Sequence, residues 1–253
     1  KVKSIQHRRQ NVKKGFIFFA IKGNQSNGEI YINEAIKNGA IIIICSKSCK
    51  FQSTKVNVIK TKKVRKYLSE ITSKFYKLKP KNIIAVTGTN GKTSVADFFY
   101  QILHLNNIPV ASIGTLGIRY RENFIKTNLT SPDVITLHKN LHELKKNKIN
   151  NVIIEASSHG LDQKRLDNLN FKAGIFTNFS QDHLDYHKTM KAYLRAKLIL
   201  FSKLLPKRSY ILVDKFIKEY SILEKISKNR KLRLLDTSKT FNDIKDLSIP
   251  LCG

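Results

Sequence analysis

From residue 82 onward, short apolar runs alternate with longer amphipathic runs, and this alternation limits the fold more than any other feature of the sequence. The strand-like runs are NIIAVT, PVASIG, NVIIEAS, AGIFTN and YILVD, and the helix-like runs cover residues 92–106, 133–148, 188–205 and 215–228. Such alternation predicts a mostly parallel sheet with helices on both faces. Ligands bind to sheets of this kind at the carboxyl ends of the strands. The residues that directly follow each strand-like run are therefore the candidates for a functional site.

The residues before 82 predict a smaller α/β unit. Its strand-like runs cover residues 15–21, 40–45 and 55–60, and its helix-like runs cover residues 28–40 and 61–78. The Lys-rich segment around Pro80 suits a linker, because proline ends a helix and water readily solvates lysine side chains. We therefore predict an α/β protein with two domains, residues 1–80 and residues 81–253.

Composition limits the class of protein. An apolar fraction of 41% and a charged fraction of 26% are typical of globular domains. The longest apolar run, residues 40–45, is far shorter than the roughly 20 residues of a membrane helix, and the N-terminal segment has no apolar core of a signal peptide. The 3 cysteines are too few for a disulfide framework. These features predict a cytoplasmic protein with reduced thiols and no membrane association.

The net charge of +29 favours anionic ligands. Nucleic-acid binding is one alternative that this charge leaves open. However, lysines are spread along the whole chain, and no recognition-helix, zinc-finger or aromatic RNA-binding pattern accompanies them. We therefore expect no nucleic-acid partner.

The segment TGTNGKTS, residues 87–94, lies between a strand-like run and a helix-like run. It shares Gly-Lys-Thr with the common phosphate-binding loop, although Val86 stands where that signature has its first glycine. In such a loop, backbone N–H groups surround the phosphates, Lys92 reaches the β- and γ-phosphates, and the Thr93 hydroxyl reaches Mg²⁺. A plain turn is the alternative on these residues alone, but the strand–turn–helix context favours phosphate binding. The larger domain is therefore predicted to be a P-loop-type ATPase domain.

In the strand-like run NVIIEAS, the apolar residues end at Glu155. An NTPase places a metal-binding carboxylate at such a strand end. Ser157, Ser158 and His159 follow Glu155. These residues could form a Ser–His nucleophile pair, but adjacent loop residues seldom face each other and no acid is placed to orient the histidine. A solvated turn is the competing interpretation.

The loop after AGIFTN contains four potential metal ligands close together in the sequence: Asp182, His183, Asp185 and His187. Without thiolates and with many oxygens nearby, this set favours Mg²⁺ beside a phosphate over zinc. In the following helix, Lys197 lies beside the apolar stripe. It is interpreted either as a surface lysine with a buried stem or as a lysine turned into the site, open to chemical modification.

Together and in this order, these segments resemble the Mur ligases, the ATP-dependent amide-forming enzymes of peptidoglycan synthesis. The nucleotide loop of that family is typically G-T-x-G-K-[ST], which matches Gly88 to Thr93 and accounts for the missing first glycine. The residues most similar to the members that add the third residue of the stem peptide are SIGTLG (112–117), LTSPD (129–133), EASSHGLDQKR (155–165) and TNFSQDHLDYH (177–187). The resemblance covers almost the whole chain.

The resemblance implies a role for each matching residue. The ATP phosphates would contact Gly88, Thr89, Asn90, Gly91, Lys92, Thr93 and Ser94. The catalytic residues would be Lys92, Glu155, His183 and Lys197, and two Mg²⁺ ions would be held by Thr93, Glu155, His183 and Lys197, the last carbamylated by CO₂. The UDP-MurNAc-dipeptide would contact Asn24, Gln25, Ser26, Thr130, Ser131, Ser157, Gln163 and Arg165.

The reaction implied by the resemblance needs no protein nucleophile. The terminal carboxylate of the dipeptide attacks the ATP γ-phosphate, giving an acyl phosphate and ADP, and the amine of a free amino acid then attacks the acyl phosphate. The residues do not identify that amino acid. We expect a monomer whose partners are these small molecules. Within the superfamily, the D-alanyl-D-alanine adding ligase and folylpolyglutamate synthase are alternatives, and SSHGLDQKR argues against both.

The chain departs from the family in two respects. Where the family has Asp-Ser-Arg near its N-terminus, this chain has His7, Arg8 and Arg9, which affects a contact expected to hold uridine. Family members also continue into a third domain after the position of Gly253. We therefore expect the chain to be a fragment with little or no ligase turnover alone.

Overall fold

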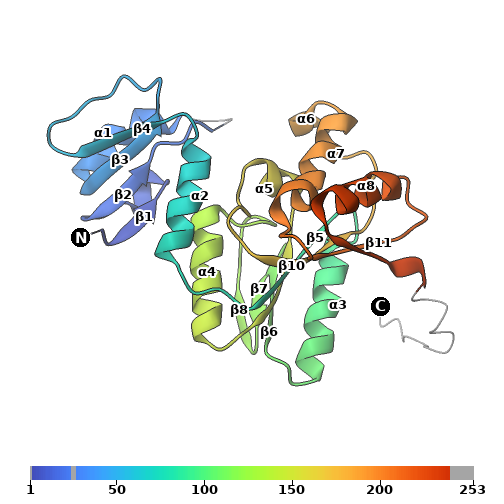
Figure 1. The fold of residues 1–253 in the computed structure, drawn as a ribbon. Coiled ribbons are helices and arrows are strands. Elements are labelled where there is room, and N and C mark those ends of the chain that lie inside the picture. Colours follow the sequence, from blue (N-terminus) through green and yellow to red (C-terminus); the bar gives the residue numbers. More distant parts are fainter. Residues whose placement is uncertain (1, 24–26, 240–253) are drawn as a thin grey trace. The chain divides into compact units, whose positions relative to one another are not determined.

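A computed structural model describes residues 2–23 and 27–239 and divides them into two compact units (Figure 1). One unit comprises the described residues up to Lys77 together with Val134–Lys139, and the other comprises Leu78–Asp133 and the described residues from Asn140 onward. Each unit is built around its own sheet. The α/β class expected from the alternating runs is confirmed.

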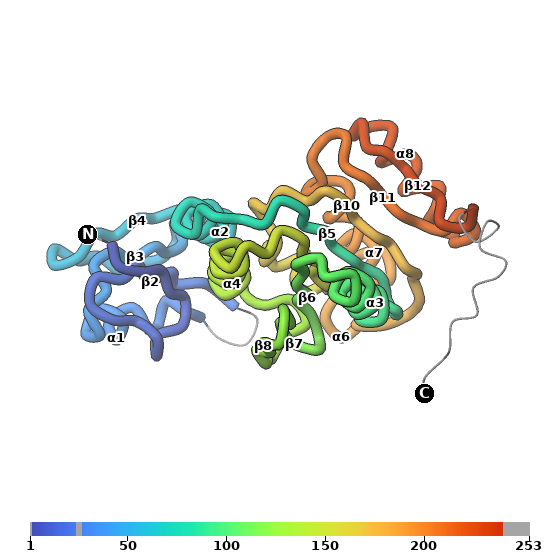
Figure 2. Tube along the Cα trace, turned by 90° about the horizontal axis from the view of Figure 1, so that it is seen from below, coloured from blue at the N-terminus to red at the C-terminus, as the bar shows by residue number. Residues whose placement is uncertain are grey.

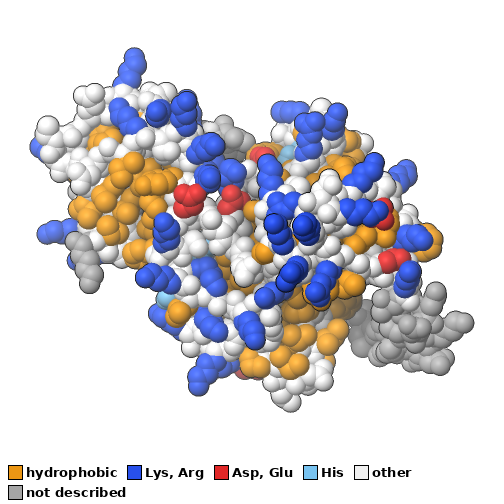
Figure 3. All heavy atoms as spheres, viewed as in Figure 1, with side chains coloured by type: hydrophobic (Ala, Val, Ile, Leu, Met, Phe, Trp, Pro, Cys, Tyr) orange, Lys and Arg blue, Asp and Glu red, His pale blue; other side chains and the backbone are white. Residues whose placement is uncertain are grey.

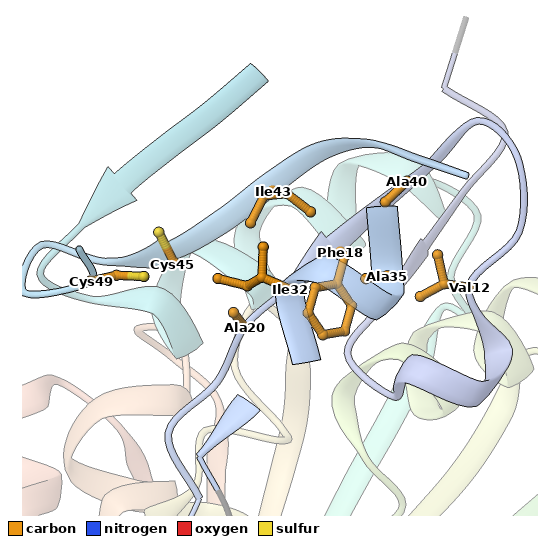
Figure 4. Close-up of a cluster of buried hydrophobic side chains, with 9 residues drawn as sticks. All are labelled: Val12, Phe18, Ala20, Ile32, Ala35, Ala40, Ile43, Cys45 and Cys49. Carbon is orange, nitrogen blue, oxygen red and sulfur yellow. The ribbon is translucent and has the colours of Figure 1, made fainter. Parts of the chain in front are cut away.

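The first unit has a four-stranded parallel sheet in the order β1-β2-β3-β4. Its elements are β1 (Ser4–Gln6), β2 (Phe16–Phe19), α1 (Ile32–Lys37), β3 (Ala40–Ser46), β4 (Asn57–Thr61) and α2 (Val64–Phe75), with 3-10 turns at Arg9–Asn11 and Gly28–Tyr31. Consecutive residues of a strand face opposite sides of its sheet. Accordingly, Phe18 lies in one buried cluster, shown in Figure 4, while its neighbours Ile17 and Phe19 lie in another. Both faces of this sheet are therefore buried.

The second unit has an eight-stranded sheet in the order β12-β11-β10-β5-β9-β6-β7-β8, and Figure 2 labels these strands except β9. Strands β12 to β6 are parallel, and β7 and β8 add an antiparallel edge. The strands are β5 (Asn82–Thr87), β6 (Val110–Gly114), β7 (Gly117–Tyr120), β8 (Asn123–Ile125), β9 (Asn151–Glu155), β10 (Phe171–Phe176), β11 (Tyr210–Val213) and β12 (Arg233–Asp236). The mostly parallel sheet was predicted, whereas its antiparallel edge was not.

The helices that follow β5 in the chain are α3 (Lys92–Leu105), α4 (Val134–Lys146), α5 (Ser158–Asp162), α6 (Leu184–His187), α7 (Met190–Ile199), a π-helical turn η3 (Leu200–Leu204) and α8 (Tyr220–Arg230). The first residues of α4, Val134–Lys139, belong to the first unit. The helices α3, α4, α8 and α7 with η3 overlap the predicted helix-like runs, whereas α5 and α6 were not predicted. Val86 and Ile153 pack with Ala96 of α3, whereas Gly174 of β10 faces Leu200 and Phe201 of η3. Because Gly174 precedes Ile175, which packs on the Val86 side, α3 and η3 cover opposite faces.

The position of β5 determines where the site forms. It lies between β10 and β9, with Thr87 in register with Phe176 and Val86 in register with Glu155. Three segments that are far apart in the sequence therefore leave the same edge of the sheet: the Gly88 loop, the residues after Glu155 and the residues after Phe176.

Basic side chains are widely distributed over the visible surface (Figure 3). Figure 3 shows Lys and Arg side chains scattered over the visible faces of both units. Among the residues that the structure describes, there is no helix with the length and apolar character needed to cross a membrane.

Candidate active site

The loop between β5 and α3 depends on its two glycines. Gly91 directly precedes α3 and has a φ of 79°, in the left-handed region that favours glycine. A Cβ atom at Gly88 would overlap Oγ1 of Thr177, which follows β10. Both glycines of the GTNG segment are therefore required by backbone geometry and close packing.

The start of α3 leaves N–H groups for a ligand. The first hydrogen bond of the helix runs from the Val95 N–H to the Gly91 oxygen, at 3.0 Å. The N–H groups of residues 92–94 precede this bond and have no acceptor inside the helix, as at any helix N-terminus. Together with the positive end of the helix dipole, they suit the binding of a phosphate.

The preceding N–H groups of the loop are used differently. The Thr89 N–H donates to the main-chain oxygen of Asn178 at 3.0 Å, and the Asn90 N–H donates to Oδ1 of Asn178 at 2.9 Å. Thr89 Oγ1 also exchanges hydrogen bonds with the main chain of Ser180, at 3.0 and 3.2 Å. The first half of the loop, Thr89 and Asn90, is therefore bound to the segment after β10.

Two lysines converge on one carbonyl oxygen of the loop. Lys92 Nζ donates to the Gly88 oxygen at 2.9 Å and to the Thr89 oxygen at 2.7 Å, and Lys197 Nζ donates to the Gly88 oxygen at 2.5 Å. Lys197 is only 1% exposed, and its Nζ lies 4.3 Å from the centre of the Tyr193 ring. Lys197 is therefore turned into the site. The alternative, a surface lysine with only its stem buried, is wrong.

Burial changes the acidity of both lysines. It lowers the pKa of Lys92, although the negative charges of Glu155 and Asp182 act in the opposite direction. Burial, followed by the charge of Lys92, lowers the pKa of Lys197 to about 7. A large fraction of Lys197 is consequently a neutral amine near pH 7.

Glu155, at the end of β9, is 1% exposed and accepts three hydrogen bonds. Its Oε1 accepts from the Thr115 N–H at 2.8 Å, and its Oε2 accepts from Thr93 Oγ1 at 2.9 Å and Thr115 Oγ1 at 3.1 Å. A Cβ atom at Gly114 would overlap this carboxylate. The glycine of the SIGTLG segment therefore makes room for Glu155.

The oxygen atoms of Thr93 and Glu155 fit a magnesium site. Mg²⁺ prefers oxygen ligands and is commonly held by one or two carboxylates together with phosphate oxygens and water. Over residues 2–23 and 27–239, no three side chains of His, Cys, Asp or Glu are grouped as a metal site. A magnesium ion here would therefore rely on Thr93, Glu155 and the phosphates of a nucleotide.

His183 lies in an aromatic cluster beside Lys197. It has a φ of 52°, which is uncommon for a residue other than glycine, and immediately precedes α6. Its ring centre lies 5.9 Å from that of Tyr193 and 4.9 Å from that of His159. His183 and Lys197 thus contact the same tyrosine ring.

His159 and His187 also belong to this aromatic cluster. Burial lowers the pKa of His159, and the neighbouring His183 acts in the same direction. Burial also lowers the pKa of His187, followed by the effect of His159. Ser157, which directly precedes α5, accepts instead from the Gly160 N–H at 3.1 Å. The side chain of His159 therefore faces the other aromatic rings while that of Ser157 caps a helix, an arrangement that does not support a Ser–His pair.

The expected substrate contacts after β9 form one hydrogen-bonded network. Ser131 Oγ donates to the Glu155 main-chain oxygen at 2.7 Å and accepts from the Ser157 N–H at 2.9 Å. Arg165 donates from Nη1 to the Ser131 oxygen and from Nη2 to Gln163 Oε1, both at 2.8 Å. Four of the predicted substrate residues are thus linked to the backbone of the candidate metal ligand.

Thr130 Oγ1 lies 3.1 Å from Thr115 Oγ1, which places it near the same carboxylate. Asn24, Gln25 and Ser26, expected to hold the uridine, lie outside the described residues. Arg9, the arginine kept from the expected Asp-Ser-Arg triplet, donates to Glu34 Oε2 at 2.9 Å and lies over the Tyr31 ring at 4.2 Å.

Several residues at the site had no individual role predicted from the sequence. Thr115 binds Glu155, Tyr193 contacts Lys197, and Thr177 and Asn178 bind the nucleotide loop. The rule that ligands bind beyond strand ends made Asn178 a candidate, but it did not predict that Asn178 binds the nucleotide loop. Thr115 also directly follows a strand, β6, so the same rule applies to it, whereas Tyr193 carries no such signal.

Comparison with known proteins matches the chain to one family. Residues 86–248 match the Mur ligase middle domain, and residues 1–76 match the catalytic domain of the Mur ligase family. A UDP-N-acetylmuramoyl-L-alanyl-D-glutamate--2,6-diaminopimelate ligase from Brucella melitensis biotype 1 is 43% identical over 196 residues, which are 78% of this chain and 40% of that protein. The ligase of the same name from Rickettsia montanensis is 39% identical over 243 residues, 94% of this chain and 50% of that protein.

A solved structure of a ligase with this name is 27% identical and superimposes with a TM-score of 0.78, covering 93% of this chain and 48% of that one. The chain thus spans about half the length of the relatives it matches. Since the middle domain alone matches well over half of the residues, the chain belongs to the Mur ligase family.

Proposed function

We propose that this chain carries the nucleotide- and acceptor-binding parts of an ATP-dependent, ADP-forming ligase that adds the third amino acid to UDP-MurNAc-L-Ala-D-Glu. The observation that carries the proposal is that Lys92 and Lys197 both bind the Gly88 oxygen of the glycine-rich loop, while Thr93, next to Lys92, binds Glu155. The names of the relatives support diaminopimelate as the added residue. The division into a UDP-substrate domain, residues 1–80, and an ATP-binding domain, residues 81–253, belongs to the same proposal.

The acceptor would lie along the network that leads to Glu155. Arg165 is the cation of this network and is oriented by Ser131 and Gln163, so it suits a carboxylate of the dipeptide. Ser157 and Thr130 would supply hydroxyl groups, and the uridine end would contact residues 24–26. This arrangement would bring the terminal carboxylate of the acceptor close to the γ-phosphate of a bound ATP.

In the first step, an oxygen of that carboxylate attacks the γ-phosphorus, and the bond to the β-phosphate oxygen breaks to release ADP. The ammonium group of Lys92 and the N–H groups of residues 92–94 neutralise charge on the transferred phosphoryl group. Mg²⁺ held by Thr93 and Glu155 would supply further positive charge beside the phosphates. In the second step, the amine of the amino acid attacks the acyl carbonyl, phosphate leaves and the amine loses a proton.

Lys197 is proposed to be carbamylated. Its neutral amine would attack CO₂, form an N–C bond and release one proton, which yields an anionic group with two oxygens. The lowered pKa of Lys197, to about 7, supports this step because only the neutral amine is nucleophilic. The product would place oxygen ligands beside His183 for a second Mg²⁺. Magnetic resonance after incubation with isotopically labelled bicarbonate tests it: a carbamate signal present in the wild type and in Lys191→Met, but absent in Lys197→Met, is expected.

Binding measurements test the proposed function without requiring turnover. By calorimetry, the chain should bind ADP in the presence of Mg²⁺ and, separately, UDP-MurNAc-L-Ala-D-Glu. Lys92→Met should weaken the binding of ADP roughly tenfold or more and leave the binding of UDP-MurNAc-L-Ala-D-Glu unchanged. Arg165→Met should weaken the binding of UDP-MurNAc-L-Ala-D-Glu to a similar extent and leave the binding of ADP unchanged. Lys191→Met, at an exposed position of α7, is the matched control.

Binding of other acceptor substrates, the molecules to which each ligase adds a residue, distinguishes the related ligases. The acceptors of the D-alanyl-D-alanine adding ligase and of folylpolyglutamate synthase should bind more weakly than UDP-MurNAc-L-Ala-D-Glu. A chain that binds neither ADP nor the UDP-linked acceptor would contradict the proposal. Retention of DNA on filters at about 0.15 M salt would favour nucleic-acid binding instead. We further propose a monomer that acts in the cytoplasm without membrane association.

A further inference from the structure

Asn178, the second residue after β10, contacts the nucleotide loop through both its main chain and its side chain. Its main-chain oxygen accepts from the Thr89 N–H at 3.0 Å. Its side-chain amide pairs with the main chain of Asn90, accepting from the N–H at 2.9 Å and donating to the oxygen at 3.3 Å. We propose that Asn178 is a positioning residue that holds the first half of the loop so that the second half can bind phosphate.

The contact with Asn90 requires a carboxamide. A main-chain N–H is only a donor and a main-chain oxygen is only an acceptor, so the two partners fix which end of the Asn178 amide faces each of them. An aspartate would supply two acceptors and no donor. The side-chain amide of Asn178 therefore binds both main-chain groups of Asn90, as the backbone of a neighbouring strand would. This pairing lies just beyond the last paired residues of β10 and β5, Phe176 and Thr87.

The sheet anchors this contact. The Thr177 N–H donates to the Thr87 oxygen at 3.0 Å, which continues the pairing of β10 with β5. Thr177 Oγ1 donates to the Asn90 oxygen at 2.6 Å. Asn90 thus receives hydrogen bonds from two consecutive residues whose backbone is fixed by the central strands.

The consequence concerns which N–H groups remain for phosphate. The Thr89 and Asn90 N–H groups are already bound by Asn178, whereas those of residues 92–94 have no acceptor inside α3. A loop that is ordered before the nucleotide arrives loses less conformational entropy on binding. Asn178 would therefore raise nucleotide affinity without touching the nucleotide. This inference rests on the proposed function, since it assumes that the loop binds phosphate.

The first test measures ADP affinity of the whole chain by calorimetry in the presence of Mg²⁺. Asn178→Ala should weaken ADP about tenfold, which is about 1.4 kcal/mol. Thr177→Val keeps the shape of the side chain and removes one hydrogen bond to Asn90. It should lower the affinity for ADP about threefold, the effect expected of one neutral hydrogen bond. Asn123→Ala, at an exposed position of β8, is the matched control and should bind ADP as the wild type does.

The second test measures amide hydrogen exchange without nucleotide. In the wild type the Asn90 N–H should exchange slowly. In Asn178→Ala it should exchange at least tenfold faster, while the Thr89 N–H, bound to a main-chain oxygen, and the amides of β5 should keep their protection. Faster exchange confined to Asn90 distinguishes lost positioning from general destabilisation. If Asn178→Ala does not fold, the threefold loss of ADP affinity expected for Thr177→Val tests the anchoring of Asn90 instead.

These outcomes separate the two proposals. Unchanged ADP affinity in Asn178→Ala, or an Asn90 N–H that stays protected in that variant, would overturn the positioning role. A wild-type chain that shows the predicted exchange pattern but binds no ADP would instead overturn the proposed function, and with it the consequence for affinity.

Discussion

Replacing Lys197 with methionine should make the chain more stable while removing a group that the proposed reaction needs. Lys197 is 1% exposed, and its Nζ donates to the Gly88 oxygen. Methionine has a similar length and no charge. The Gly88 oxygen would keep a donor after the substitution, because Lys92 Nζ also binds it at 2.9 Å. The substitution therefore removes a buried cation without leaving that acceptor unpaired.

The magnitude follows from the pKa. Lowering the pKa of Lys197 from 10.5 to about 7 corresponds to about 4 kcal/mol of lost stability at pH 7, at about 1.4 kcal/mol per pKa unit. Imperfect packing of the methionine offsets up to about 1.5 kcal/mol of the gain. We therefore expect a net increase in the free energy of unfolding of about 2.5 kcal/mol, or a rise in Tm of about 5–10 °C.

The gain should depend on pH with a defined sign. Between about pH 7 and pH 10.5, the unfolded state binds the Lys197 proton more than the folded state does, so wild-type stability rises with pH. Below this range the lysine is charged in both states and the cost is fully present; above it the lysine is neutral in both states. The advantage of Lys197→Met should thus be largest near pH 7 and below, and should shrink toward pH 10.

Thermal unfolding in buffer depleted of CO₂ tests this reasoning, because depletion keeps the wild-type side chain an amine. Lys191→Met lies on the exposed side of the same helix and should change stability by less than about 0.5 kcal/mol. A Lys197→Met chain that is less stable than the wild type at pH 7, or whose advantage stays constant up to pH 10, would refute the argument.

Three further predictions concern other parts of the chain. Ser131→Ala should lower the free energy of unfolding in urea by about 1–3 kcal/mol, because the Ser157 N–H and the Glu155 oxygen lose their common partner; an unchanged urea midpoint would contradict this. Glu155→Gln keeps the shape of the side chain but removes its charge, so calorimetry should show a loss of roughly tenfold or more in Mg²⁺-dependent ADP affinity and no change in EDTA. Burial raises the pKa of Cys45 from 9.0 to about 12, so the folded state keeps this proton longer than the unfolded state. Wild-type stability relative to Cys45→Ala should therefore fall from pH 9 upward, as equilibrium unfolding at several pH values can show.

The sequence predicted the parts of the fold that depend on local pattern. The alternating runs predicted the central strands and the long helices, because burial on both faces of a parallel sheet leaves continuous apolar segments. The β7–β8 edge was not predicted. Its strands are 4 and 3 residues long, and one of them contains Arg119, so neither forms an apolar run.

For the candidate site, the sequence identified side chains that follow strand ends and left their orientation open. The stripe beside Lys197 could not show whether the lysine faces water or the Tyr193 ring, since that depends on a cluster built from three separate segments. Asn178 acts through pairing with the backbone of Asn90, and pairing between loops 88 residues apart leaves no periodic signal. The resemblance to a family supplied roles that spacing alone left undecided.

The central position of β5 also has a consequence for how the chain folds. β5 precedes both of its neighbours, and its first partner residue in β9 lies 69 residues further along the chain. At a synthesis rate of about 5–20 residues per second, roughly 3–14 s pass between the appearance of β5 and that of β9. During this time the apolar NIIAVT segment has neither edge paired. Folding of the second unit is therefore dominated by non-local strand pairing, which is intrinsically slow, and the nucleotide loop acquires its anchor only after β10 has been made.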